Sequence, residues 1–294
     1  MTSAPRRDRN RQGMLLALLL PMAPALAAGT PCAPPHAVGS TQPTLVDPTR
    51  ENRGIPVRLH YPASAAGAGT PALTGCGFPI IAFGHGFTIG VSAYTWLADG
   101  LAAAGFIVVM PATEGGVSPD HGEFGRDLGY LTEALSASSP WNQAAGNGRA
   151  IGGHSMGGGS AVLGVAGTSG IAALFALAPA QTNPSAISAA SGIAVPTLFI
   201  TGSRDCVTPS AGHAGAILAA LATPASLKRQ SDIDGASHCQ FSGGSLTCSI
   251  GESSCGGGAT ISASSQQAQT LALLIPWLQE QFSPQPPLLA DGFE

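Results

Sequence analysis

Residues 149–160 read RAIGGHSMGGGS and contain the pattern Gly153-x-Ser155-x-Gly157. A short apolar run comes before the pattern, and a run of Ala, Gly, Val and Leu follows it over residues 161–166. That order predicts a strand, a sharp turn and a helix. A serine on such a turn adopts a strained backbone conformation that lifts its hydroxyl clear of the sheet. The flanking glycines are needed because a Cβ there would strike the neighbouring strand or helix.

The pattern alone does not identify a nucleophile, since the chain contains 40 glycines and a Gly-rich loop can match it by chance. Its context favours the catalytic interpretation. A helix that begins at the serine directs its N–H groups and the positive end of its dipole at the reacting centre. We therefore predict that Ser155 is a nucleophile, provided that the rest of the chain supplies its partners.

A serine hydroxyl needs a general base, and the base needs an acid that orients it. In folds with this elbow, the order along the chain is serine, acid, histidine. Only His213 and His238 follow Ser155. His213 lies in a predicted helix over residues 209–221, where a solvated histidine is expected. His238 follows the last predicted strand, in the segment GASHC, and is therefore the predicted base.

The acid is predicted at the end of the strand over residues 195–201. Asp205 lies in the turn that follows this strand, and reactive groups gather at the carboxyl ends of parallel strands. The alternative for this residue is a turn-stabilising role. Asp232 and Asp234 are too near His238 in the sequence to reach across to its ring. Asp205 is therefore the predicted acid of the triad.

Acyl transfer creates an oxyanion that needs two N–H donors. The residue after the nucleophile supplies one of them, and that residue is Met156. The other donor is expected from the loop after the strand over residues 78–83, and the Phe87 N–H is the candidate. His85 and His154 each lie beside a glycine in a tight turn, so we interpret both as packing or hydrogen-bonding residues.

Strands that alternate with helices predict an α/β fold, with a mostly parallel central sheet and helices on both faces. Besides the elbow strand, the predicted strands cover residues 55–61, 78–83, 106–110, 171–177, 195–201 and 225–233. Besides the elbow helix, the predicted helices cover residues 92–104, 126–135, 209–221 and 264–282. Residues 29–49 are Pro-rich and are expected to be irregular. We find no internal repeat and no second domain in the sequence.

Residues 1–28 are predicted to be a secretory signal peptide. Four arginines precede a short apolar run, and residues 25–27 (ALA) form a small-x-small cleavage site. The apolar run is too short to span a bilayer. We expect a secreted or periplasmic protein with one α/β domain over residues 29–282 and a Pro-rich tail over residues 283–294.

The chain has 12 basic and 16 acidic residues and a formal net charge of −4. The predicted leader contains four arginines and one aspartate, so 8 basic and 15 acidic residues remain and the net charge becomes −7. A surface so poor in Lys and Arg excludes a nucleic-acid partner. Only 10% of the residues are charged, which suits uncharged or apolar substrates or reflects an alanine-rich genome. We expect a monomer without a stable protein partner.

Six cysteines lie beyond the predicted leader, and an even number in an exported chain predicts disulfides, with 15 possible pairings. One cysteine directly follows the predicted acid and another the predicted base, so a hydrogen bond between acid and base would bring the two within bridging range. Cys248 and Cys255 are then paired because they are close in the sequence, and Cys32 and Cys76 are the two that remain. The predicted disulfides are Cys206–Cys239, Cys248–Cys255 and Cys32–Cys76. The spacing of potential ligands favours no metal site, and no cofactor is expected.

Several segments resemble the bacterial cutinase and polyester-hydrolase branch of the α/β-hydrolases. They are GHGFT at 84–88, GHSMGGG at 153–159, Ala178-Pro179, VPT at 195–197 with Gly202-x-x-Asp205, and GASH at 235–238. They occur in that family's order and span most of the chain. Residues 78–110 also resemble chlorophyllase and platelet-activating-factor acetylhydrolase.

The resemblance implies an α/β-hydrolase fold without a large lid, and a secreted serine esterase with a Ser-His-Asp acyl-enzyme mechanism. It also implies that substrate contacts Phe87, Thr88 and Ala180. Because Ala180 stands where polyester hydrolases usually carry a tryptophan, we expect aliphatic polyesters and short to medium acyl esters to be preferred over aromatic polyesters. The alternatives are a small-ester or lipid esterase of the chlorophyllase type and a non-catalytic binding protein on the same fold.

Overall fold

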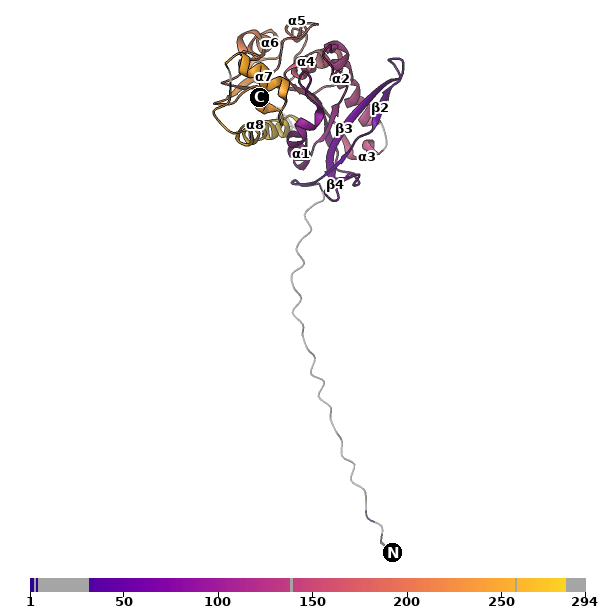
Figure 1. The fold of residues 1–294 in the computed structure, drawn as a ribbon. Coiled ribbons are helices and arrows are strands. Elements are labelled where there is room, and N and C mark those ends of the chain that lie inside the picture. Colours follow the sequence, from indigo (N-terminus) through magenta and orange to yellow (C-terminus); the bar gives the residue numbers. More distant parts are fainter. Residues whose placement is uncertain (3, 5–31, 138–139, 257, 284–294) are drawn as a thin grey trace, which may run out of the picture. The chain divides into compact units, whose positions relative to one another are not determined.

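A mixed β-sheet forms the centre of the protein, and helices cover both of its faces (Figure 1). The computed structural model describes residues 1–2, 4, 32–137, 140–256 and 258–283. The predicted signal peptide and C-terminal tail lie almost entirely outside these residues. The described residues from position 32 onward belong to one compact unit.

The strands and helices follow the α/β pattern that the sequence predicts. The strands are β1 (Ala37–Thr41), β2 (Thr44–Asp47), β3 (Arg53–Ala63), β4 (Gly67–Ala68), β5 (Phe78–Gly84), β6 (Ile107–Pro111), β7 (Ala145–His154), β8 (Ala173–Leu177), β9 (Thr197–Gly202) and β10 (Lys228–Ile233). The α-helices are α1 (Thr95–Ala103), α2 (His121–Ala137), α3 (Trp141–Ala144), α4 (Met156–Gly167), α5 (Ala186–Ala190), α6 (Ala214–Ala220), α7 (Leu246–Ser254) and α8 (Ala263–Phe282). The 3₁₀ turns are η1 (Val91–Tyr94), η2 (Ser210–Gly212), η3 (Ala225–Leu227) and η4 (Cys239–Phe241). Of the helices in the described part of the chain, none combines the length and the apolar character that crossing a membrane requires.

The order of the strands places the predicted site residues at one edge of the sheet. The order is β10-β9-β8-β7-β5-β6-β3-β1-β4, with β2 paired to β3. Strands β5 to β10 are parallel, whereas β3 is antiparallel to β1, β2 and β6. Parallel strands end at the same edge, which we call the carboxyl edge. The GHGFT loop follows β5, and the elbow at Ser155 follows β7. The loop with Asp205, which we call the acid loop, follows β9, and the loop with His238, the base loop, follows β10.

Both faces of the sheet are buried, which explains why the central strands are continuous apolar runs. Strand β5 shows the alternation clearly. Ile80 and Ala82 pack in the cluster that includes α2, α4, α5 and α6. Ile81 and Phe83 point to the opposite face and pack in the cluster that includes α1 and α8. The two cores hold the sheet and therefore fix the carboxyl edge.

Several segments differ from the sequence-based expectation. The Pro-rich residues 29–49, expected to be irregular, contain β1 and β2, which pair with β3 through backbone hydrogen bonds and so do not require an apolar sequence. Strand β4 and helices α3, α5 and α7 were not expected. Helix α7 contains no buried residue, and its large apolar side chains, Leu246 and Ile250, are exposed. The helix predicted over residues 209–221 is divided into η2 and α6.

Disulfides join Cys32 to Cys76, Cys206 to Cys255 and Cys239 to Cys248. The first agrees with the prediction, but the predicted Cys206–Cys239 and Cys248–Cys255 bonds are wrong. Cys248 lies in α7 and Cys255 directly follows the helix. Seven residues along a helix rise about 10 Å, which exceeds the roughly 4.4–6.8 Å between the Cα atoms of bonded cysteines, so these two do not bond to each other. Cys248 bonds to Cys239 and Cys255 to Cys206, with Cα–Cα distances of 5.6 and 5.9 Å, respectively.

Candidate active site

The elbow around Ser155 has the strained conformation that its sequence predicts. Ser155 lies between β7 and α4 with φ 54° and ψ −121°, a positive φ that is uncommon for residues other than glycine. A Cβ on Gly153 would lie 2.2 Å from the Gly157 carbonyl oxygen, and a Cβ on Gly157 would lie 2.2 Å from the Gly84 carbonyl oxygen. The glycines therefore let α4 pack directly on the ends of β7 and β5.

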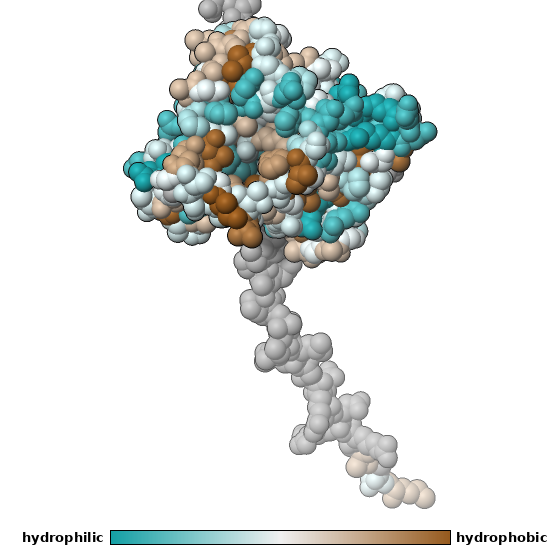
Figure 2. All heavy atoms as spheres, turned by 45° about the horizontal axis from the view of Figure 1, so that its top comes forward, coloured by the Kyte–Doolittle hydropathy of each residue, from teal (hydrophilic) through white to brown (hydrophobic). Residues whose placement is uncertain are grey.

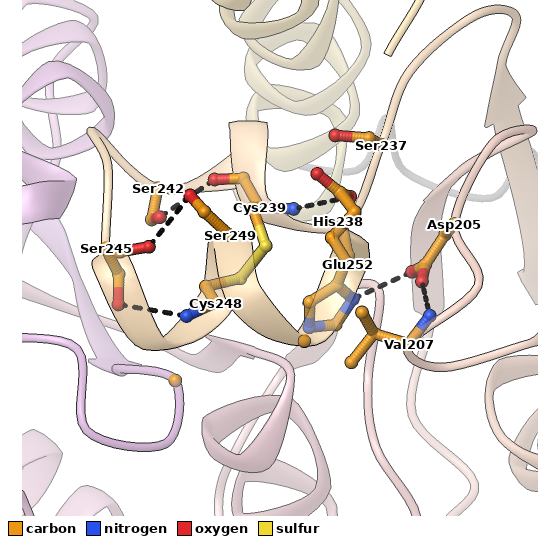
Figure 3. The surroundings of a disulfide bond; sticks show 12 residues. Asp205, Val207, Ser237, His238, Cys239, Ser242, Ser245, Cys248, Ser249 and Glu252 are labelled. Carbon is orange, nitrogen blue, oxygen red and sulfur yellow. Dashed lines mark hydrogen bonds and ion pairs between the residues drawn. A yellow bond between two sulfur atoms is a disulfide. The ribbon is translucent and has the colours of Figure 1, made fainter. Parts of the chain in front are cut away.

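The predicted acid and base are hydrogen-bonded to each other. Asp205 follows β9, and His238 follows β10, the neighbouring strand. His238 Nδ1 lies 2.8 Å from Asp205 Oδ2, and both side chains are almost completely buried. Figure 3 shows this pair, with the imidazole directed toward the carboxylate. Residues 33 positions apart in the sequence thus form the hydrogen-bonded pair that the sequence predicts as acid and base.

The acid loop holds the Asp205 carboxylate in place. Oδ1 accepts hydrogen bonds from the backbone N–H groups of Val207 and Thr208, and Oδ2 accepts one from Thr208 Oγ1. Burial raises the pKa of Asp205, but the hydrogen bonds from His238 and Thr208 outweigh it, and the net pKa lies below the ordinary value. Asp205 therefore remains ionised and can orient the imidazole.

The residue before Ser155, His154, contacts the ring of His238. No hydrogen bond joins Ser155 Oγ to His238 among the described residues, but the ring of His154 lies 4.7 Å from the ring of His238, centroid to centroid. The backbone of the elbow is fixed by two hydrogen bonds, from Ser155 N–H to the Leu177 carbonyl and from Ala180 N–H to the Ser155 carbonyl. In sites without substrate, such nucleophile–base contacts are commonly long.

The two predicted oxyanion donors come from adjoining segments. Met156 is the first residue of α4, and Phe87 lies in the GHGFT loop that follows β5. Among the described residues, neither N–H donates a hydrogen bond to a protein acceptor. Helix α4 also directs the positive end of its dipole at this point. Both N–H groups are therefore available to a ligand oxygen.

The three predicted substrate-binding residues lie around the elbow. The Phe87 side chain is 42% exposed, which is unusual for so large an apolar group. Thr88 adopts a positive φ of 53°, and its Oγ1 donates a hydrogen bond to the Phe87 carbonyl. Ala180 is half-buried next to Ser155.

Three further histidines lie near the site, and none occupies the position of the base. His85 and His154 are buried and hydrogen-bonded. His213 was expected to be solvated within a helix; it lies instead at the start of α6, where its Nδ1 accepts a hydrogen bond from Gln181 N–H. Burial lowers the pKa of His213, and the charges of Asp205 and His238 act on it as well, so it lies in the field of the pair. In the part of the chain that the structure describes, no group of three or more His, Cys, Asp or Glu residues could hold a metal ion.

Helix α7 connects the acid loop to the base loop. Its Cys248 bonds to Cys239, directly after His238, and the following Cys255 bonds to Cys206, directly after Asp205. Glu252 Oε1 also accepts a hydrogen bond from the Cys239 N–H (Figure 3). The cysteines that directly follow Asp205 and His238 indicated that the two loops are covalently held. The sequence analysis predicted a direct bond between them and missed the connection through α7.

Large exposed apolar side chains gather on the segments around the carboxyl edge. They are Phe87 of the GHGFT loop, Val117 of the loop after β6, Val207 of the acid loop, and Leu246 and Ile250 of α7. Leu246 and Ile250 are 79% and 60% exposed and lie one turn apart. Figure 2 shows patches of apolar residues bordering a hollow in the molecular surface. Exposed apolar side chains are therefore concentrated on the segments that carry the predicted site residues.

Comparison with known proteins identifies one family. The model of the PETase family, described as PET hydrolase-like, matches residues 56–250. That range includes the GHGFT loop, the elbow, Asp205 and His238. A search of curated proteins finds no match.

Removing the Cys206–Cys255 bond should disturb the acid–base pair as well as the stability. We expect Cys206→Ser/Cys255→Ser to lose up to about 4 kcal/mol of stability in the chain-entropy model. Its kcat on a soluble ester should fall even below its melting temperature, because the acid loop is then no longer tied to α7. Thermal melts and active-site-titrated kinetics measure both effects.

The matched control is Cys32→Ser/Cys76→Ser, which opens a loop of similar length, 44 against 49 residues, at the amino end of β5. It should lose similar stability and keep its kcat. Equal kcat values in the two double variants would contradict a role of the Cys206–Cys255 bond in the site.

Proposed function

Since the chain belongs to the PET hydrolase-like family, whose members are ester hydrolases, we propose that it is a serine esterase that cleaves carboxylic esters through an acyl-enzyme. The observation that carries this proposal is the 2.8 Å contact between Asp205 Oδ2 and His238 Nδ1. The ring of His238 packs against that of His154, which directly precedes the strained Ser155. The family supplies the reaction class, and this geometry supports the serine mechanism.

In the proposed acylation step, Ser155 Oγ attacks the ester carbonyl carbon while His238 Nε2 accepts the hydroxyl proton. The ionised Asp205 stabilises the imidazolium that forms. The carbonyl oxygen becomes an oxyanion, which the N–H groups of Phe87 and Met156 bind. The tetrahedral intermediate then collapses, and the imidazolium gives its proton to the departing alcohol.

Deacylation repeats these steps with water as the nucleophile. His238 removes a proton from the water as it attacks the acyl-enzyme, and the same two N–H groups bind the second oxyanion. Collapse releases the carboxylic acid and returns the proton to Ser155 Oγ. No redox or metal chemistry enters these steps.

An uncharged, largely apolar ester is the substrate class that we propose. The exposed apolar side chains around the carboxyl edge and the low charge of the chain support it. Within that class, we favour aliphatic polyesters and short to medium acyl esters, because Ala180 offers no aromatic wall. Export is proposed as well, on the basis of the predicted leader and the three disulfides.

The first test addresses the nucleophile. Ser155→Ala should lower the hydrolysis of nitrophenyl esters by at least about 10³-fold, because the members of a triad act as a unit. The melting temperature should be preserved, and the variant should not react with a fluorophosphonate. If the wild-type protein neither hydrolyses esters nor reacts with the probe, it is a non-catalytic binding protein.

The second test addresses the aromatic wall. Ala180→Trp should raise turnover of an aromatic polyester by about 2- to 10-fold, the equivalent of the 0.5–1.5 kcal/mol that an aromatic pair contributes. The control is Ala180→Leu, which adds apolar volume without a ring. Products are measured by chromatography after incubation with films of both polymer types. A wild-type preference for the aromatic polymer would refute the substrate assignment.

The third test separates a solid substrate from a soluble one. Leu246→Ser/Ile250→Ser should lower adsorption to an aliphatic polyester film by roughly 10-fold, because two exposed aliphatic side chains lose their contact with the polymer. Hydrolysis of soluble nitrophenyl butyrate should not change. The control Leu227→Ser removes an exposed apolar side chain just before the start of β10, at the opposite edge of the sheet. If adsorption is the same in the double variant and in this control, a small ester is favoured over a polymer.

A further inference from the structure

One buried tyrosine contacts both the nucleophile elbow and the GHGFT loop. Tyr94, the last residue of η1, has no exposed surface. Its Oη accepts a hydrogen bond from the Gly86 N–H at 2.9 Å and lies 2.8 Å from His154 Nδ1. Gly86 directly precedes Phe87, and His154 directly precedes Ser155. A single hydroxyl therefore lies one residue away from two groups of the proposed mechanism.

The hydrogen-bond pattern assigns the protons of this cluster. Because Tyr94 Oη accepts the Gly86 N–H, its own proton is directed at His154 Nδ1. Burial raises the pKa of Tyr94 and lowers the pKa of His154 far below the ordinary value, so the phenol and the neutral imidazole are the stable forms. His154 then carries its proton on Nε2, and its ring packs against the ring of His238.

The carbonyl group of Gly86 is fixed as well. It accepts a hydrogen bond from the Ile89 N–H at 3.0 Å, and His85 Nδ1 lies 2.9 Å from the same oxygen. The peptide group between Gly86 and Phe87 is planar and trans, so the Phe87 N–H points opposite to the Gly86 carbonyl. Holding Gly86 on both sides therefore sets the direction of the Phe87 N–H.

The space around Gly86 leaves no room for a side chain. A Cβ there would lie 2.9 Å from Ile89 Cδ1 and 3.1 Å from both His154 Nδ1 and Tyr94 Oη. The backbone of the loop is therefore enclosed by the groups that hold it. Tyr94 is the member of this cluster that binds the loop and the elbow at once.

We propose that Tyr94 is a positioning residue for ester hydrolysis, whose hydroxyl holds Gly86 so that the Phe87 N–H points at the oxyanion. The proposal rests on the proposed function. Removing the hydroxyl leaves the Gly86 N–H and His154 Nδ1 buried without a partner, at a cost that the loop relieves by shifting. The Phe87 N–H then moves away from the position where negative charge develops.

The test compares two tyrosine variants. In Tyr94→Phe, kcat on nitrophenyl butyrate should fall about 10- to 100-fold per site titrated with a fluorophosphonate, with little change in KM. The control is Tyr61→Phe, which removes the hydroxyl of another tyrosine with a buried side chain; that hydroxyl donates to the Thr70 carbonyl, away from the site. It should keep its kcat. If Tyr94→Phe loses no more kcat than Tyr61→Phe, the proposal is overturned.

The Ki of a transition-state analogue distinguishes a positioning role from a merely structural one, because only the positioning role predicts a specific loss of oxyanion binding. A trifluoromethyl ketone forms a tetrahedral adduct with the serine, and its oxyanion occupies the same hole. In Tyr94→Phe, its Ki should rise by the factor by which kcat/KM falls, whereas the Ki of the alcohol product should not change. A proportional rise of both constants would indicate general damage and contradict the proposal.

Two more variants keep the test decisive. His154→Gln retains an acceptor for the Tyr94 hydroxyl and leaves Gly86 held, so it should lose much less kcat than Tyr94→Phe; an equal loss would place the effect at His154 and overturn the proposal. If Tyr94→Phe does not fold, Gly86→Ala displaces the hydroxyl sterically, and full activity in that variant refutes the role. A wild-type protein without esterase activity would refute the proposed function instead.

Discussion

A close backbone contact between two glycines, Gly157 of α4 and Gly84 at the end of β5, determines the geometry of the site. Helix α4 approaches the end of β5 so closely that a Cβ on Gly157 would lie 2.2 Å from the Gly84 carbonyl oxygen and 2.5 Å from that of His85. Helix α4 also packs closely against α2, where a Cβ on Gly125 would lie 2.8 Å from the Ser160 carbonyl oxygen. The helix N-terminus and the GHGFT loop are therefore held as one unit. A side chain at Gly157 would separate the two N–H groups proposed to bind the oxyanion.

The acid and base loops are held in a different way. No residue of α7 is buried, so apolar packing contributes little to its position. Two disulfides and the hydrogen bond from Cys239 N–H to Glu252 take the place of a core. Each covalent bond restricts the unfolded chain and fixes one end of the helix against one loop. The acid and base thus keep their register through an element outside both loops, while the surface of α7 remains free to expose Leu246 and Ile250.

Sequence patterns predicted the parts of the protein that local chemistry dictates. The apolar run of β5, the glycines of the elbow and the order of Ser155, Asp205 and His238 each follow from a local requirement, and all occupy the expected places in the fold. The disulfide pairs depend on α7, a helix that the sequence analysis did not predict, so two of three were wrong. The role of Tyr94 could not be predicted either, because a buried tyrosine in an apolar run resembles ordinary core until its hydroxyl partners are known.

The GHGFT loop is also supported by contacts that do not involve Tyr94. Asp127 of α2 is completely buried and accepts two hydrogen bonds from Arg53 and one from Thr113 Oγ1, with Arg50 at ion-pair distance. Such a carboxylate is tolerated only because it is fully paired. The Thr113 carbonyl lies 2.9 Å from Nε2 of His85, whose Nδ1 lies 2.9 Å from the carbonyl oxygen of the following glycine. The Pro-rich segment that was expected to be irregular therefore helps to support the GHGFT loop. It contains β2, and the connection from β2 to β3 carries Arg50. The position of one backbone N–H thus depends on the antiparallel strands as well as on the parallel ones, and the elbow motif alone is not sufficient to build the site.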